Sequence, residues 1–260
     1  MTFDLYIGID YSGRQTPTKR TKHLQVYTAE CGQEPQTVET PASKPKKRRY
    51  WNRKEIAEWL VGLCHMGRPF LAGIDHAFSF PVSYLDRYGV LSWSVFLEDF
   101  CKHWPTHRTD ATVQSLRTNN PRIGTSDQFR LTEKWSSSAK SVFLFDVKGS
   151  VAKSTHAGIP WLRYIRQQGE DKLHFWPFDG WDVPEGKSVL AEVYPSIFRN
   201  RYARMTGAIE RTVDQQDAYA VAHWLEETTR RGFFGRYLNP PLTQEERRQA
   251  EREGWILGVA

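Results

Sequence analysis

The chain has 260 residues, of which 39% are hydrophobic and 13% aromatic, so it can bury one large core or two small ones. No apolar run approaches the roughly 18 residues of a membrane-spanning helix, and the N-terminus lacks the basic and apolar segments of a signal peptide. We therefore expect no membrane partner. The three cysteines form no Cys-x-x-Cys pair, which argues against zinc and disulfide frameworks and favours a cytoplasmic protein.

The formal net charge is +6, and the positive charge is concentrated near the N-terminus. Positions 14–54 contain 11 Lys and Arg residues against three Glu residues, and five of the six residues at 44–49 are basic. A basic balance of this kind is compatible with nucleic acid as a partner. A run of solvated surface charge is an equally good interpretation of residues 44–49.

The first expected strand, at positions 3–9, leads into Gly8-Ile9-Asp10 and then a Ser12-Gly13 turn. An acid at the end of a strand beside small residues is a common way for an α/β protein to present a carboxylate to a metal or a phosphate. Asp10 is therefore a candidate metal ligand, and Ser12 is a candidate substrate contact. The alternative is a polar residue that merely ends a strand.

Positions 23–29 and 36–40 fit two further strands, joined to the first as antiparallel hairpins. A helix capped by Asn52 follows and ends at Gly67. The next expected strand, at 70–74, runs into Asp75 and repeats the Gly-Ile-Asp pattern of the first. This β-β-β-α-β order is typical of the start of a ribonuclease-H-like sheet, and it would place both acids at one edge. His76 adjoins the second acid as a candidate substrate contact or proton shuttle, and a supporting or surface role is the alternative.

Helical periodicity covers positions 82–103 and stops before Pro105, and a polar stretch follows to position 141. We interpret about 82–141 as an insertion within a single domain that spans residues 1–260. Its basic residues are numerous enough to contact a polyanion, although a solvated surface excursion is an equal alternative: Arg108, Arg117, Arg122, Arg130, Lys134 and Lys140.

Residues 146–155 look superficially like a phosphate-binding P-loop. The pattern fails because Val147 and Ala152 stand where that motif requires glycine. Ser150 and Lys153 also have the spacing of a serine–lysine acylase pair, but so short a match arises often by chance. A Gly-Ser turn with a nearby lysine can still hold a phosphate through backbone N–H groups. Ser150 and Lys153 are therefore candidate substrate contacts.

A helix at 157–168 and strands at 172–177 and 187–195 are expected next. Glu192 interrupts the last strand, where a buried carboxylate is costly unless it binds a cation or pairs with an arginine. The helix at 212–230 carries Asp217 near its start, followed by small alanines that let it approach a sheet closely. Stabilisation of the helix dipole is the alternative role for this acid. A peripheral C-terminal segment, 232–260, contains a last helix at 244–253.

Several of these motifs, in this order, resemble those of a family of uncharacterised predicted nucleases with a ribonuclease-H-like fold. They are Gly8-Ile9-Asp10, Gly73-Ile74-Asp75 with Phe80-Pro81, Gly149–Lys153 with Gly158-Ile159-Pro160, Ala191-Glu192-Val193-Tyr194-Pro195, and Asp217-Ala218-Tyr219-Ala220. The resemblance implies an α/β fold whose mixed sheet has three antiparallel strands and then parallel strands, flanked by helices. It also implies a metal-dependent phosphodiesterase.

The acids that the resemblance assigns to catalysis and metal binding are Asp10, Asp75, Glu192 and Asp217. Carboxylates are the ligands that Mg²⁺ or Mn²⁺ prefers, and two such ions ~4 Å apart can activate water for cleavage of a phosphodiester. We expect Asp10 to bridge both ions and a basic residue such as Lys153 to neutralise the scissile phosphate of DNA or RNA. A non-catalytic nucleic-acid-binding or scaffold protein with the same fold is the main alternative.

A third interpretation is an actin-like or sugar-kinase-like ATPase, because residues 7–13 also resemble the first phosphate loop of those proteins. That fold usually needs two such domains and a second glycine-rich phosphate loop, and no Asp-x-Gly-Gly segment is present in the chain.

Overall fold

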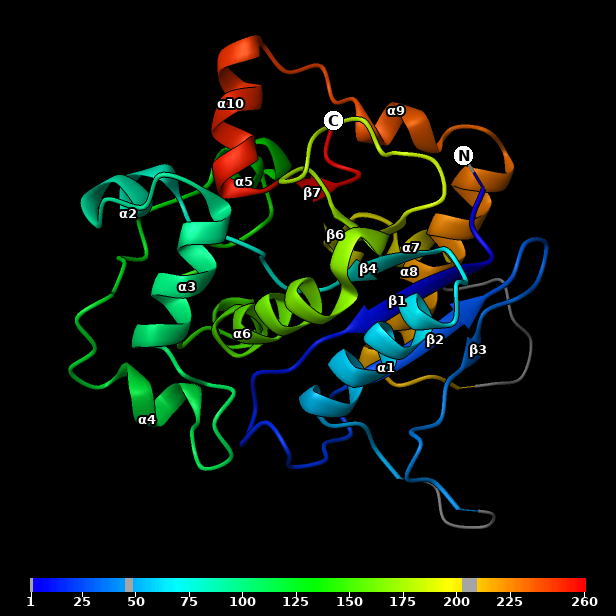
Figure 1. Ribbon diagram of the computed structural model, residues 1–260, viewed down its shortest axis with the longest axis horizontal. Helices are drawn as coiled ribbons and strands as arrows, with labels where there is room; N and C mark the ends of the chain where they lie inside the picture. The colour runs from blue at the N-terminus through cyan, green and yellow to red at the C-terminus, as the bar shows by residue number, and fades with distance from the viewer. Residues whose placement is uncertain (1, 45–48, 203–209) are drawn as a thin grey trace.

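A computed structural model describes residues 2–44, 49–202 and 210–260 (Figure 1). Its centre is a seven-stranded mixed sheet, made of β1 (Leu5–Asp10), β2 (Gln25–Ala29), β3 (Gln36–Thr37), β4 (Phe70–Ile74), β5 (Leu173–Phe175), β6 (Ser188–Val193) and β7 (Ile256–Leu257). The strand order is β3-β2-β1-β4-β6-β5, with β7 paired to β6. The expected α/β class with a mixed sheet is confirmed.

Strand direction changes at β1, which lies in the middle of the sheet. The first three strands pair antiparallel, whereas β4, β6 and β5 continue from β1 in parallel. All six residues of β1 and all five of β4 are buried, which is why both read as continuous apolar runs. Because parallel strands end at the same edge, the carboxyl ends of β1, β4 and β6 lie together.

Two layers of helices cover the sheet. The helices α1 (Arg53–His65), α3 (Trp93–His103) and α6 (Ala152–Gly169) share one apolar core with Ile7 and Ile9 of β1. On the opposite face, α8 (Val213–Arg230) shares a second core with Tyr6. Alternate residues of β1 therefore face different helix layers, as a pleated strand requires. Figure 1 shows α1 and α6 in front of the strands and α8 behind them.

The region expected as an insertion contains four helices: α2 (Val82–Arg87), α3, α4 (Val113–Arg117) and α5 (Leu131–Ser136). The single helix expected at 82–103 is divided into α2 and α3, because Gly89 adopts a positive φ of 66° after the first turn and a half. Phe96 and Phe100 of α3 belong to the same core as the sheet, so this region packs onto the fold rather than apart from it.

Helix α6 begins at Ala152, five residues before the start expected from the sequence, and it contains Pro160. A proline inside a helix leaves the carbonyl four residues earlier without its usual partner. Here that carbonyl belongs to His156, and it accepts a hydrogen bond of 2.7 Å from the hydroxyl of Thr106. The substitute bond explains how α6 continues through its proline.

The remaining helices are α7 (Arg199–Tyr202), α9 (Phe234–Leu238) and α10 (Gln244–Glu253). The C-terminal segment expected to be peripheral ends inside the fold, since β7 pairs with β6 and Trp255 is fully buried. The helix expected at 244–253 is confirmed with those bounds, whereas the short strand beyond it was not expected. None of the helices in the described ranges is long and apolar enough to cross a membrane.

Candidate functional site

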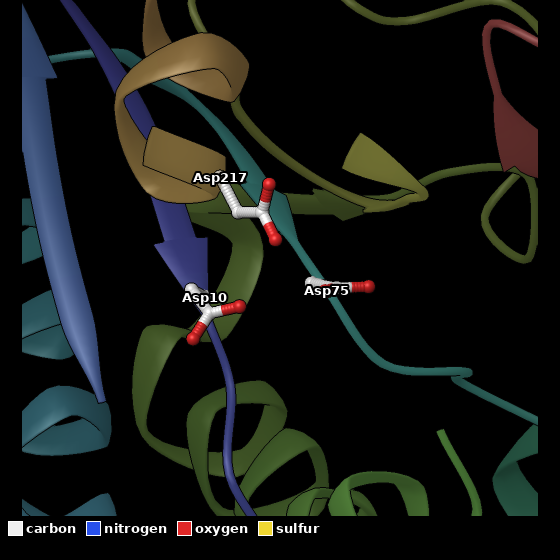
Figure 2. A group of neighbouring side chains, drawn as sticks. All are labelled: Asp10, Asp75 and Asp217. Carbon is white, nitrogen blue, oxygen red and sulfur yellow. The ribbon is translucent and has the colours of Figure 1, made fainter. Parts of the chain in front are cut away.

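Three aspartates that are far apart in the sequence converge at the carboxyl edge of the sheet. Asp10 ends β1, Asp75 follows β4, and Asp217 lies in the second turn of α8. One carboxylate oxygen from each lies within 4.8 Å of the others, and Figure 2 shows the three side chains as neighbours, Asp10 and Asp75 where their strands end and Asp217 on the helix. Ile9 pairs with Ile74, and the N–H of Asp75 donates to the carbonyl of Ile9 at 2.9 Å, so the parallel register itself sets two of the acids side by side.

Glycine brings the third acid within reach. A Cβ atom on Gly8 would lie 2.0 Å from the carbonyl oxygen of Ala218, and one on Gly73 would lie 2.7 Å from a methyl of Val221. Only glycine at these positions lets α8 lie directly on β1 and β4. The cap at Thr212, whose side chain accepts from the N–H of Gln215, then fixes where the helix begins.

Burial and mutual repulsion make this cluster hold protons more tightly than isolated acids do. Burial raises the pKa of Asp10 well above its ordinary value, and the charges of Asp75, Asp214 and Asp217 raise it further. Burial, followed by the charges of Asp217 and Glu192, raises the pKa of Asp75 to about 8. A bound cation would reverse this repulsion, and carboxylate oxygens are the donor type that Mg²⁺ and Mn²⁺ prefer. The donor set of the three aspartates therefore fits a divalent metal.

An arginine lies in the cluster. Arg199 of α7 makes a two-pronged ion pair with Asp217: Nη2 lies 2.6 Å from Oδ2, and Nε donates to Oδ1. Its charge also lowers the pKa of Asp10 and of Asp75. The guanidinium thus neutralises part of the charge that a metal would otherwise balance.

Glu192 lies beside the cluster but is bound elsewhere. It pairs with Ile74 across β4 and β6, next to Asp75. Its two carboxylate oxygens accept bonds of 2.6 and 2.7 Å from Arg130, which is 1% exposed. The structure therefore shows the ion pair with an arginine that was the alternative for this residue. The three acids that group together do not include Glu192 among the described residues, and its role as a metal ligand stays a prediction.

Three of the four candidate substrate contacts line one surface groove of about 810 Å³ beside Asp10. Ser12 is buried, and its hydroxyl accepts from the N–H of Arg14 at 3.3 Å. Ser150 uses its hydroxyl to donate to the carbonyl of Leu144. Lys153 is exposed on the first turn of α6. The structure thus brings these side chains together, although they come from two distant segments.

His76, the fourth candidate, is buried in the core instead. Its ring packs against Tyr11 and Phe78 and fits over Gly158, where a Cβ would lie 2.4 Å from Nε2. Its Nδ1 lies 2.8 Å from the carbonyl of Ala77, and burial lowers its pKa to about 4. A neutral, enclosed imidazole of this kind packs the sheet against α6, which is the supporting role considered for it.

Arg199 carries no local signal in the sequence, because its partner Asp217 lies 18 residues away. Arg130 was expected among the basic residues that could contact a polyanion, but it is 1% exposed and pairs with Glu133 and with Glu192, 62 residues away. Comparison of the chain with protein-family models, curated proteins and solved structures finds no significant match.

Proposed function

We propose that this chain is a divalent-metal-dependent nuclease with a ribonuclease-H-like fold that hydrolyses phosphodiester bonds in DNA or RNA. The observation that carries the proposal is the convergence of Asp10, Asp75 and Asp217 at the carboxyl ends of two adjacent parallel strands. The strand order, with three antiparallel strands followed by parallel neighbours of β1, supports the fold. The resemblance of the sequence motifs to predicted nucleases supports the chemistry.

In this proposal Asp10, Asp75 and Asp217 hold Mg²⁺ or Mn²⁺. When bound, such ions lower the pKa of water and stabilise charge on the phosphate oxygens. Asp10, at the end of the central strand, would hold the metal together with the other two acids. Lys153 supplies a positive charge in the neighbouring groove, where it would orient the phosphate, while buried His76 stays uncharged near pH 7.

A non-catalytic nucleic-acid-binding protein is the second candidate. The observation that favours it is that arginines already engage two of the four expected acids, Glu192 through Arg130 and Asp217 through Arg199. A protein that only binds nucleic acid could use these ion pairs in place of metal. Binding would then be the same with and without divalent ions.

Cleavage of labelled single-stranded and duplex DNA and RNA, with Mg²⁺ or Mn²⁺, separates the two candidates. We expect metal-dependent cleavage by the wild type. The cleavage rate of Asp10→Asn and of Asp75→Asn should fall by more than about a hundredfold, because mutating even the groups that only orient metal ligands lowers activity by up to about that factor. Asp171→Asn, an exposed acid just before β5 and so at the opposite edge, should cleave like wild type. Absence of cleavage of every substrate, with unchanged nucleic-acid binding in both site variants, would favour the second candidate.

A further inference from the structure

The groove beside Asp10 has walls from four segments. They are the loop at residues 11–15 after β1, the start of α4, the loop at 145–150, and the first turn of α6. Figure 1 shows α4 and the loop after β1 on the same side of the molecule, near the first turn of α6. A Cβ on Gly13 would lie 1.9 Å from the carbonyl oxygen of Lys153, so the loop after β1 rests directly against the helix. This contact fixes the position of Lys153 relative to Asp10.

The groove is positively charged. Arg14, Lys148 and Lys153 line it and are exposed, and within the described ranges none of these three side chains has an acidic partner in an ion pair. Asp146 is the acid in the lining, and Arg117 binds it at 2.8 Å. Three cations therefore face the groove without local neutralisation, which favours a polyanionic occupant.

The groove lies next to the acid cluster. Its lining begins with Tyr11 and Ser12, the two residues after Asp10. Gly149 lines both this groove and the small cavity that Asp75 and Glu192 line. A chain of phosphates lying in the groove would thus have one end near Asp10.

The lining suits phosphate and sugar rather than bases. Apart from the cations, Asp146, Val113 and Val147, its side chains outside the aromatic rings are hydroxyls and amides, from Ser12, Gln15, Thr112, Gln114, Ser150 and Ser154. Its two aromatic rings are already engaged: Tyr11 packs against His76, and the guanidinium carbon of Arg117 lies 4.4 Å from the centroid of Phe145. Base recognition on single strands usually relies on open aromatic faces, which these two rings do not offer.

We propose that this groove binds the sugar–phosphate backbone of a nucleic-acid strand without reading its bases, through Arg14, Lys148 and Lys153. The inference rests on the proposed function only for the identity of the polymer, because the groove itself needs no metal. The strand runs from the groove to the acid cluster, and its contacts are to phosphates. Affinity therefore depends on salt and not on base composition.

Fluorescence anisotropy of labelled 20-nucleotide single strands, in EDTA, tests this binding without any cleavage. We expect Arg14→Gln, Lys148→Gln and Lys153→Gln each to weaken binding several-fold and to reduce the slope of log K against log salt by about 0.7, the value for one phosphate contact on a single strand. Strands of oligo-dT and of mixed sequence should bind with affinities within about threefold. All three side chains are exposed, so the variants should fold normally, which their thermal unfolding can verify.

Lys187→Gln is the matched control, because Lys187 lies just before β6 and so at the opposite edge of the sheet. It should bind like wild type. Equal affinity and equal salt slope in wild type and all three groove variants would overturn the inference, as would a preference of more than about tenfold for one sequence. If the groove variants lose binding but the wild type cleaves no substrate, the groove inference is supported and only the nuclease proposal is refuted.

Discussion

Arg199 is the residue that sets the charge of the acid cluster when no metal is bound. Its two bonds to Asp217 hold one of the three candidate ligands, and 35% of its side chain is exposed, so it can leave toward solvent. Partly exposed ion pairs contribute little to stability. If the proposed metal binds, Arg199 would compete with it for Asp217.

Replacing Arg199 with glutamine should strengthen Mn²⁺ binding. We expect an affinity about tenfold higher than that of wild type, equivalent to ~1.4 kcal/mol, because Asp217 is freed and a repelling charge is removed. Isothermal titration calorimetry measures this directly. Arg201→Gln is the control, since Arg201 lies in the same helix but pairs with Glu227 at 2.9 Å. Weaker binding in Arg199→Gln, or equal strengthening in both variants, would show that Arg199 does not compete.

At this scale the sequence predicts the acids better than their partners. Asp10 and Asp75 stand at strand ends in a repeated pattern, and Asp217 stands before small residues on a helix, so each carries a local signal that the geometry bears out. The ion pairs of Arg130 with Glu192 and of Arg199 with Asp217 form only in the tertiary structure. A single sequence contains nothing that pairs them.

At the scale of elements, the site depends on how closely α8 packs against β1. The helix carries Asp217 and lies over Gly8, where even one added carbon would meet the carbonyl of Ala218 at 2.0 Å. Backbone atoms cannot move aside as a flexible side chain can, so a larger residue must displace the helix. Displacing α8 moves Asp217 away from the acids on the strands.

Gly8→Ala should therefore destabilise the protein by about 1–3 kcal/mol or more, the usual cost of overpacking, and should also weaken Mn²⁺ binding. Urea unfolding and calorimetry measure the two effects. Gly62→Ala is the matched control, because Gly62 lies inside α1 with nothing near an added Cβ. It should stabilise the helix by roughly 0.5–1 kcal/mol and leave metal binding unchanged. A Gly8→Ala variant as stable as wild type would refute the close packing.

Elements with strong local signals were predictable. The cap at Asn52 marks the start of α1, and the apolar runs mark β1, β4 and β6. The start of α6 was not predictable, because Gly158 and Pro160 weaken the helical pattern. The hydrogen bond from Thr106, far away in the sequence, replaces the one that the proline removes. The short β7 likewise forms only because β6 offers it an edge.

At the scale of the whole molecule, the fold gathers negative charge at one edge of the sheet and places a basic groove beside it. The pKa of Asp75 is raised from 3.8 to about 8, so the folded chain retains a proton that the unfolded chain has lost. The contribution of this group to stability is therefore most favourable below pH 4 and declines as the pH rises to about 8. A metal that binds the carboxylate must displace that proton.

The measurement that tests the central claim most directly is a Mn²⁺ titration of the wild type and Asp75→Asn at pH 6.5 and pH 8.0. We predict that the wild type binds Mn²⁺ at both pH values. Binding should be about tenfold tighter at pH 8.0, because fewer of the Asp75 carboxyl groups then carry a proton that the metal must displace. Asp75→Asn should bind far more weakly and with a smaller pH dependence, because the metal then displaces protons only from the remaining acids. Absence of Mn²⁺ binding by the wild type at either pH, or equal binding by Asp75→Asn, would contradict the assignment of the three aspartates as a metal centre.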